Sequence, residues 1–197
     1  MLLLNVSATD DALRGPECRA NVAHTIPSDA MLTDELALRA HAGRYDLDIS
    51  PLVAVGHSAG GHLALWLSGR DRLPADSPLR TADPIEIDTV ISLGGLPDLE
   101  EAAREPGSGC GTAVIGQLTG GHFEDTSVPR LAPLGVRQIL INGLDDRIIP
   151  PAYAASYAVP MRAAGDEVTV MLADGGSPTL LSGATEGWLG VLMPMRV

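Results

Sequence analysis

The amino-acid sequence predicts an α/β protein in which helices flank a mainly parallel sheet. Short apolar runs without polar alternation recur along the C-terminal three quarters of the chain, as expected of strands buried on both faces. Longer stretches with the apolar spacing of a helix separate these runs. Such alternation of strand and helix is typical of βαβ units and therefore indicates a parallel sheet.

The N-terminal region contains the fewest recognisable elements. Residues 1–6 are expected to form one strand, and residues 7–27 show no clear periodicity. A helix is predicted to begin at Ser28 or Thr33, because either side chain can cap it, and to end near Tyr45. Little of the chain before Ser28 is therefore assigned.

The centre of the chain holds the first clear strand and helix pair. Pro51 leads into a strand over residues 52–56, and the helix that follows ends at Gly69. Residues 70–88 are rich in Pro, Asp and Arg and are predicted to form a surface loop. The next strand is predicted over residues 89–93.

Two further strands and a helix are predicted towards the C-terminus. The strands cover residues 138–142 and 167–172, with a helix from about 152 to 164 between them. Pro160 removes a backbone donor inside this helix and should kink or shorten it. Neither an internal repeat nor a linker interrupts the pattern, so residues 1–197 are interpreted as one domain.

The amino-acid composition disfavours several classes of binding partner. The chain has 197 residues, 45% hydrophobic and 19% charged, which suits one globular domain. Thirteen basic and 25 acidic residues give a formal net charge of −12, which disfavours nucleic acid and anionic membranes as partners. The sequence shows neither a signal-peptide core nor an apolar run near the roughly 20 residues that span a bilayer. We therefore expect a cytoplasmic protein.

The two cysteines do not predict a metal or disulfide site. Cys18 and Cys110 lack a CxxC partner and clustered histidines, so both are expected to be reduced, small apolar side chains.

A serine motif lies at the turn between the strand 52–56 and the next helix. Residues 56–60, Gly-His-Ser-Ala-Gly, match G-x-S-x-G in the strand–turn–helix context that this motif requires. The tight turn needs small flanking residues and projects the hydroxyl beyond the sheet. Ser58 is thus the candidate nucleophile, and the Ala59 amide is one candidate oxyanion donor.

A phosphate-binding turn is the alternative interpretation of this segment. A dinucleotide fingerprint beginning at Gly56 would need glycine at Ser58, and the Gly-Lys-Ser/Thr of a P-loop does not occur. The nucleophile turn is therefore favoured.

Asp146 is the candidate carboxylate of a catalytic triad. A serine nucleophile needs a histidine base, which a carboxylate orients. Asp146 follows the strand that ends at Asn142, and it comes after Ser58 in the order Ser…Asp…His. The alternative is an ordinary Asp-rich turn with solvated carboxylates.

Residues 53–66 and the pattern Gly-x-x-Asp-x-x-Ile-Pro at 143–150 resemble the α/β-hydrolase superfamily, in particular its prolyl-oligopeptidase-like and arylformamidase-like esterase branch. The resemblance spans roughly residues 29 to 172. It implies that Ser58 is the nucleophile, Ala59 an oxyanion amide and Asp146 the triad acid. It also implies hydrolysis of a carboxylic ester or amide through an acyl-enzyme, with no metal and no organic cofactor.

The family carries its triad histidine after the last core strand, and here Ser177 stands at that position. His122 is the last histidine of the chain. It lies in Gly-Gly-His-Phe at 120–123, which resembles the family's histidine segment but precedes Asp146. Two interpretations stay open: a variable loop between strands, or a base that reaches Ser58.

The other histidines are not expected to act as bases. His57 and His62 belong to the serine turn and the helix that it opens, and both are interpreted as structural. His24 and His41 are interpreted as surface or helix-face residues.

The part before Ser58 also departs from the family. About 57 residues precede this serine, and the His-Gly-Gly that supplies a second oxyanion amide does not occur among them. The chain therefore resembles an N-terminally truncated form of the fold.

These observations predict a serine hydrolase, a carboxylesterase or an arylformamidase-like enzyme, with impaired activity and a small-molecule ester or amide as substrate. A catalytically degenerate binding or assembly protein and a fragment of a complete hydrolase are the alternatives. An exposed sheet edge could pair with a second copy, giving a homo-oligomer.

Overall fold

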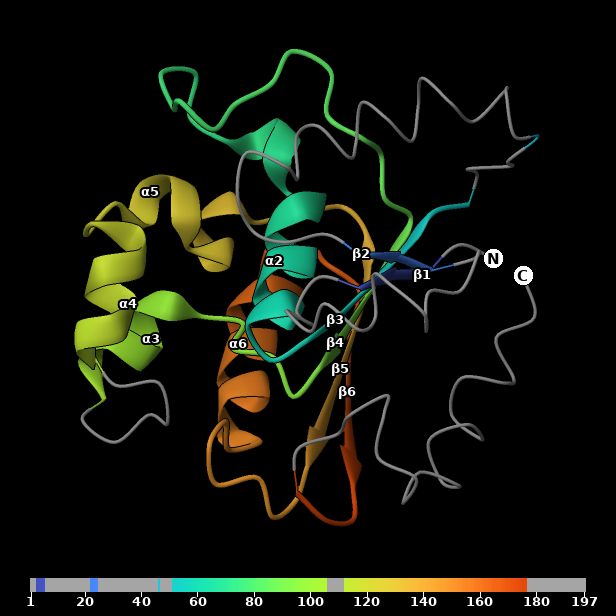
Figure 1. The fold of residues 1–197 in the computed structure, drawn as a ribbon, viewed down its shortest axis with the longest axis vertical. Helices are drawn as coiled ribbons and strands as arrows, with labels where there is room; N and C mark the ends of the chain where they lie inside the picture. The colour runs from blue at the N-terminus through green and yellow to red at the C-terminus, as the bar shows by residue number, and fades with distance from the viewer. Residues whose placement is uncertain (1–2, 6–21, 25–45, 47–50, 106–111, 177–197) are drawn as a thin grey trace.

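The computed structural model describes residues 3–5, 22–24, 46, 51–105 and 112–176. Within these ranges one parallel sheet has the strand order β2-β1-β3-β4-β5-β6 (Figure 1). The strands are β1 Leu3–Asn5, β2 Val22–His24, β3 Val53–His57, β4 Thr89–Leu93, β5 Arg137–Gly143 and β6 Val168–Ala173. The prediction of an α/β protein with a parallel sheet is confirmed.

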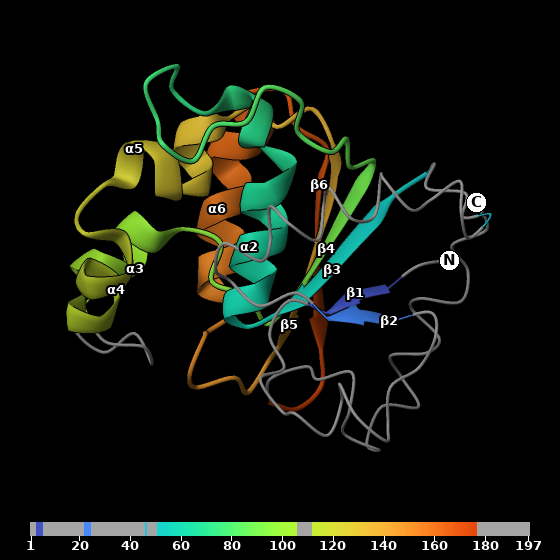
Figure 2. The same cartoon turned by 45° about the horizontal axis from the view of Figure 1, so that its top comes forward.

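The described helices lie on one side of this sheet. Figure 1 and Figure 2 show α2 and α6 against one face, with α3, α4 and α5 grouped farther out. The α-helices are α2 Ala59–Ser68, α3 Leu99–Arg104, α4 Thr112–Thr119, α5 Phe123–Thr126 and α6 Ala152–Ala163, and the short 3₁₀ turns are η2 Arg70–Arg72 and η3 Val128–Leu131.

Both faces of the sheet are apolar. Leu140 of β5 packs with Leu65 of α2 and Tyr157 of α6, whereas its neighbours Ile139 and Ile141 belong to a cluster on the opposite face. Successive side chains of a strand point to opposite faces, so a strand buried on both sides reads as a continuous apolar run. This explains why the strand pattern was visible in the sequence.

A separate apolar cluster joins the outer helices to α6. Leu99 of α3 and Ile115 of α4 pack with Tyr153 of α6. Asp98 caps α3, accepting hydrogen bonds from the N–H groups of Glu100 at 2.9 Å and Glu101 at 3.1 Å. Apolar packing, in addition to the covalent connections, therefore holds the outer helices against the rest of the fold.

The predicted strands at 52–56, 89–93, 138–142 and 167–172 correspond to β3, β4, β5 and β6 to within one residue. The strand expected in residues 1–6 is β1, and the helix predicted to end at Gly69 is α2. Strand β2 was not predicted, because three residues are too few for a period to be recognised. The helix expected from Ser28 or Thr33 to Tyr45 lies outside the described residues.

Two predictions need correction. Pro160 does not shorten α6, which continues to Ala163. Pro160 and Ser156, whose carbonyl it leaves without an N–H donor, are both exposed, so water can serve that carbonyl. The segment 70–88 is also more than a surface loop, because it contains η2 and three buried aliphatic side chains, Leu73, Ile85 and Ile87.

Within the part of the chain that the structure describes, every helix is too short or too polar to span a bilayer.

Candidate active site

The strand order places Ser58 where parallel sheets commonly bind ligands. Strand β2 lies on one side of β1, and β3 to β6 follow on the other side, so the direction of winding reverses between β1 and β3. Ligands of open α/β sheets bind outside the carboxyl ends of the strands at such a reversal. Ser58 directly follows β3, at its carboxyl end.

The turn at Ser58 has an unusual backbone conformation. Ser58 has φ 56° and ψ −123°, a region that non-glycine residues rarely adopt. Its N–H donates to the carbonyl of Leu93 in β4 at 3.0 Å, and its own carbonyl accepts from the N–H of Gly61 at 2.9 Å. The neighbouring strand and the first turn of α2 therefore hold the serine in this conformation.

Glycines around the turn are required by close backbone contacts. A Cβ atom at Gly56 would lie 1.9 Å from the carbonyl oxygen of Gly60, and one at Gly61 would lie 2.8 Å from the Cα of Gly95. Both distances are far below van der Waals contact. The structure thus gives the physical reason for the small residues that flank Ser58, and it adds Gly61, which the motif analysis did not single out.

The amide of Ala59 has the properties of an oxyanion donor. Ala59 is exposed and is the first residue of α2. The first N–H groups of a helix have no partner within the helix, and they form the positive end of its dipole. The Ala59 N–H therefore stays a candidate donor to an oxyanion formed at Ser58.

Asp146 is buried, unlike a solvated turn carboxylate. Its exposed fraction is 6%, whereas the adjacent Asp145 is exposed. The N–H groups of Ile148 and Ile149 donate to Oδ1 of Asp146 at 2.9 and 3.0 Å. Within the described residues, its buried Oδ2 has no hydrogen-bond partner. One carboxylate oxygen is thus fixed in place and the other remains an acceptor.

The loop of Asp146 is hydrogen-bonded to the last residue of β6 and to the segment that follows it. The N–H of Leu144 donates to the carbonyl of Ala173, and that of Asp145 to the carbonyl of Gly175, both at 2.8 Å. Ser177, which occupies the family's histidine position, follows this segment and lies outside the described residues.

His57 closes β3 and directly precedes Ser58. Its side chain is half-buried. Burial lowers the pKa of the imidazole below 6.5, while the negative charge of Asp146 acts in the opposite direction. The ring is therefore neutral near pH 7 and lies within the electrostatic influence of Asp146. The structural part that sequence reasoning assigned to His57 stays a prediction.

His62 lies in the interior of the protein. Its side chain is 6% exposed, and its Nδ1 lies 3.1 Å from the carbonyl oxygen of Leu96. Burial lowers its pKa to about 4. A buried ring that hydrogen-bonds the backbone agrees with the structural part expected of it.

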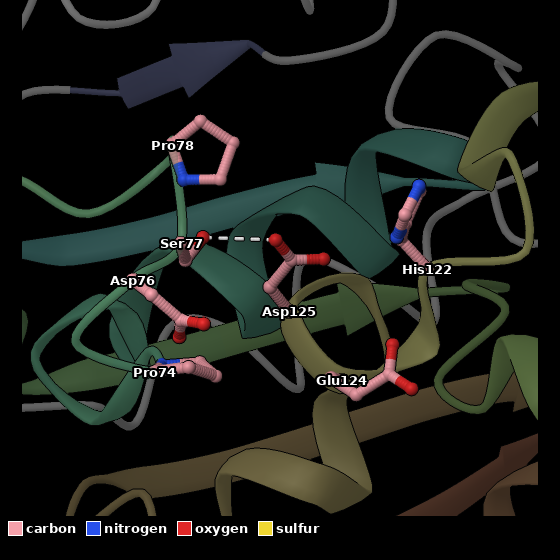
Figure 3. A pocket seen from close by; sticks show the side chains of 7 residues that line it. All are labelled: Pro74, Asp76, Ser77, Pro78, His122, Glu124 and Asp125. Atoms are coloured by element: carbon pink, nitrogen blue, oxygen red, sulfur yellow. Dashed lines mark hydrogen bonds between the residues drawn. The ribbon is translucent and has the colours of Figure 1, made fainter.

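The structure places His122 directly before α5, one of the outer helices. His122 is exposed, precedes α5 and borders a surface pocket of about 340 Å³ (Figure 3). The other residues that line this pocket are Pro74, Asp76, Ser77, Pro78, Glu124 and Asp125. Among the described residues, no hydrogen bond joins His122 to Ser58 or Asp146. Its proposed role as base remains a prediction.

Cys18 and Cys110 lie outside the described residues. Within the described part of the chain, His, Asp and Glu side chains do not gather in groups of three or more that could hold a metal ion.

Comparison with known proteins identifies similar structures. No family model and no curated protein sequence matches the chain. A propionate-bound esterase from Thermogutta terrifontis is 17% identical with a TM-score of 0.67, and the match covers 98% of this chain and 79% of that one. The carboxylesterase Cest-2923 from Lactobacillus plantarum is 15% identical with a TM-score of 0.68, covering 94% and 76%.

An acylaminoacyl peptidase from Pyrococcus horikoshii is also similar. It is 18% identical with a TM-score of 0.56, and the match covers 79% of this chain and 24% of that one. At these identities, the likeness shows a shared fold, and the function has to be argued from the site.

Proposed function

We propose, from the α/β-hydrolase fold of this chain, that it is a serine hydrolase that cleaves carboxylic esters or amides. One observation carries the proposal: Ser58 is held in a strained backbone conformation at the carboxyl end of β3, where the sheet reverses its winding. Such strain persists where the surrounding structure stabilises it, and functional sites are where it concentrates.

The proposed reaction has two halves. The Ser58 hydroxyl loses its proton to a base and attacks the substrate carbonyl carbon, while the Ala59 N–H stabilises the oxyanion. The leaving group takes the proton, which leaves an acyl group on Ser58, and water then releases the acid by the same route. Asp146 stabilises the base while it is protonated, since its Oδ2 is buried and can accept a hydrogen bond.

The substrate class follows from charge and from the similar structures. A formal net charge of −12 disfavours strongly anionic substrates. The Thermogutta terrifontis esterase binds propionate, and likeness to esterases and to a peptidase supports the esterase branch that the sequence resembles. We therefore propose small neutral esters with short acyl groups.

A second candidate is a degenerate hydrolase fold that binds a ligand or another chain. Ser177 at the histidine position favours it, because serine cannot act as a base near neutral pH.

Covalent labelling separates the two candidates. The Thermogutta terrifontis esterase reacts with the organophosphorus compound sarin, so a fluorophosphonate probe suits this test. We expect the wild-type protein to be labelled and to hydrolyse p-nitrophenyl propionate, and Ser58→Ala to lose both properties. Absence of labelling in folded wild-type protein would contradict the hydrolase and favour the binding protein.

A further inference from the structure

Strand β6 forms one edge of the described sheet. It is the last strand in the order β2-β1-β3-β4-β5-β6 and pairs with β5 on one side (Figure 1). Its sequence, Val-Thr-Val-Met-Leu-Ala over residues 168–173, contains neither a charged residue nor a proline. Edge strands commonly carry such residues because they prevent pairing with another chain. The residue types of β6 therefore permit a further strand on its outer side.

The hydrogen bonds of β6 show which backbone groups point to this outer side. The carbonyls of Glu167 and Ala173 accept from N–H groups of β5 and of the residue that follows it, at 2.9 and 2.8 Å. Alternate residues of a strand direct their N–H and C=O groups to the same side. Residues 168, 170 and 172 therefore direct theirs away from β5, to the outer edge.

Arg162 of α6 closes one end of this edge. Its Nε and Nη2 donate to the carbonyl of Val168 at 3.0 and 2.7 Å. A carbonyl that already accepts two hydrogen bonds is not available to the N–H of an added strand. Among the described residues, the outward groups of Val170 and Leu172 make no hydrogen bond. The edge is therefore blocked at Val168 and open over residues 170–172.

Two exposed apolar side chains lie beside the open part of the edge. Leu172 of β6 is 54% exposed, and Val159 of α6 is 68% exposed. Val159 precedes Arg162 by three residues, so it lies on the side of α6 that reaches the edge. A chain paired with β6 would satisfy the outward backbone groups and also remove apolar surface from water.

We propose that β6 pairs antiparallel with β6 of a second copy of this chain, which joins the two sheets across a two-fold axis. The open groups determine the register: Val170 lies opposite Leu172 of the partner subunit, and Met171 lies at the axis. Each such pair exchanges two N–H···O bonds, and the symmetry makes two pairs. Placing Val170 opposite itself would instead pair Leu172 with Val168, whose carbonyl Arg162 occupies.

Charges at the two ends of β6 support a second copy as the partner. Arg162 is bound at the first residue of the strand, and the exposed Asp174 directly follows its last residue. In the proposed register Val168 lies opposite Asp174 of the partner subunit, so each end brings a guanidinium close to a carboxylate. The formal net charge of −12 on each copy opposes association elsewhere on the surface. This inference does not depend on the proposed hydrolase activity.

The first experiment measures sedimentation and residue-resolved amide exchange of the wild-type chain, from low to high micromolar concentration in about 0.15 M salt. We expect a reversible dimer of twice the 20.5 kDa chain mass. The N–H groups of Val170 and Leu172 should become protected as the dimer forms, whereas those of Thr169 and Met171 are protected throughout. A monomer at every concentration overturns the proposal. Protection of Val170 and Leu172 that does not depend on concentration overturns it as well, because the same chain would then cover the edge.

The second experiment changes the edge itself. Leu172→Pro removes an outward N–H without removing a hydrogen bond to β5, and it should raise the dissociation constant of the dimer at least about tenfold. Leu172→Lys, which should also weaken the dimer, is measured beside Leu118→Lys on α4, where the leucine is likewise exposed. A folded Leu172 variant that dimerises as tightly as wild type overturns the proposal. Equal weakening by Leu118→Lys overturns it too.

The third experiment tests the register through charge. Asp174→Arg places two guanidinium groups together at each end of the interface, and it should weaken the dimer about threefold or more. Asp76→Arg, at an exposed residue of the outer pocket, changes the net charge equally and should not weaken it. Because both variants reduce the overall repulsion between copies, weakening confined to Asp174→Arg supports the proposed pairing. A dimer that Asp174→Arg leaves unchanged or tightens overturns it.

Discussion

Asp145 and Asp146 are adjacent carboxylates on one loop, yet only Asp146 is buried. Two N–H groups fix one oxygen of Asp146, whereas Asp145 contributes its backbone N–H to the segment after β6. Their residue types are identical, so the difference arises entirely from the backbone of the loop. This is why composition alone could not tell which of the two carboxylates is buried.

The two carboxylates form a matched pair for measuring catalysis. We expect Asp146→Asn to lower kcat/KM roughly 10³- to 10⁴-fold, because an amide cannot stabilise the protonated base. Asp145→Asn should remain within about threefold of wild type. Steady-state hydrolysis of p-nitrophenyl propionate checks both values, and equal losses in the two variants would contradict the role of Asp146.

Gly56 gives a prediction about stability. Gly56→Ala would place a Cβ atom 1.9 Å from the carbonyl oxygen of Gly60, and the shift needed to relieve this contact should cost about 1–3 kcal/mol of unfolding free energy. Gly116 in α4 is the control, because a Cβ there meets nothing within 4 Å.

Gly116→Ala should stabilise the protein by up to about 1 kcal/mol, since alanine favours a helix more than glycine does. Urea unfolding followed by circular dichroism measures both variants. An unchanged free energy of unfolding in Gly56→Ala would show that the close backbone contact in the serine turn does not require glycine.

Elements differed in how far the sequence could predict them. The strands β3 to β6 were visible because each buries both faces, so every position favours an apolar residue. Strand β2 and helix α5 have three and four residues, which is less than a recognisable period. Such short elements are stabilised by their tertiary neighbours rather than by local preference.

Asp166 connects two elements and supports a further prediction. It is 7% exposed and accepts from the N–H groups of Leu134 and Gly135, at 3.0 and 2.8 Å, just before β5 begins. Asp166→Ala leaves both donors without this acceptor and should cost roughly 2–3 kcal/mol in unfolding free energy.

The neighbouring Glu167 is a suitable control for Asp166. Its contact with Arg137 is 3.4 Å long and both side chains are exposed, so Glu167→Gln should change stability by less than about 0.5 kcal/mol. Thermal and urea unfolding would distinguish the two variants. Similar small effects in both would contradict a structural role of Asp166.

At the scale of the whole molecule, strand type and direction were predictable but the reversal between β1 and β3 was not. A pattern of apolar runs shows that strands exist. Their order in the sheet depends on how the connections between strands pack against it, and that packing is decided by contacts between residues far apart in the sequence. The place of His122 was unpredictable for the same reason, because helices α3 to α5 carry the segment between β4 and β5 away from the sheet. The strand, turn and helix around Ser58 were predictable because the turn constrains residue type locally.

Stability of the whole molecule should depend on pH through His62. Its pKa is lowered to about 4 in the folded protein, against 6.5 for the ordinary group, so between these values the unfolded chain binds the proton more strongly. The stability contributed by the neutral ring is therefore present above pH 6.5 and lost as the pH falls towards 4. At pH 5 the loss should be roughly 2 kcal/mol relative to pH 7.

His62→Gln, which retains a donor for the carbonyl of Leu96, should reduce this dependence on pH. Urea unfolding at pH 7, 6 and 5 measures it in both proteins. An equally steep decline in the variant would assign the effect to other groups.

The positive φ of Ser58 also sets a stability cost on which natural selection can act. Glycine adopts positive φ without a side-chain penalty, whereas another residue there costs of order 1–3 kcal/mol. Ser58→Gly should therefore unfold at higher denaturant concentration than wild type while losing covalent labelling. A protein that no longer needed this hydroxyl for catalysis could gain stability through one substitution at position 58. Retention of the serine therefore means that this stability is given up.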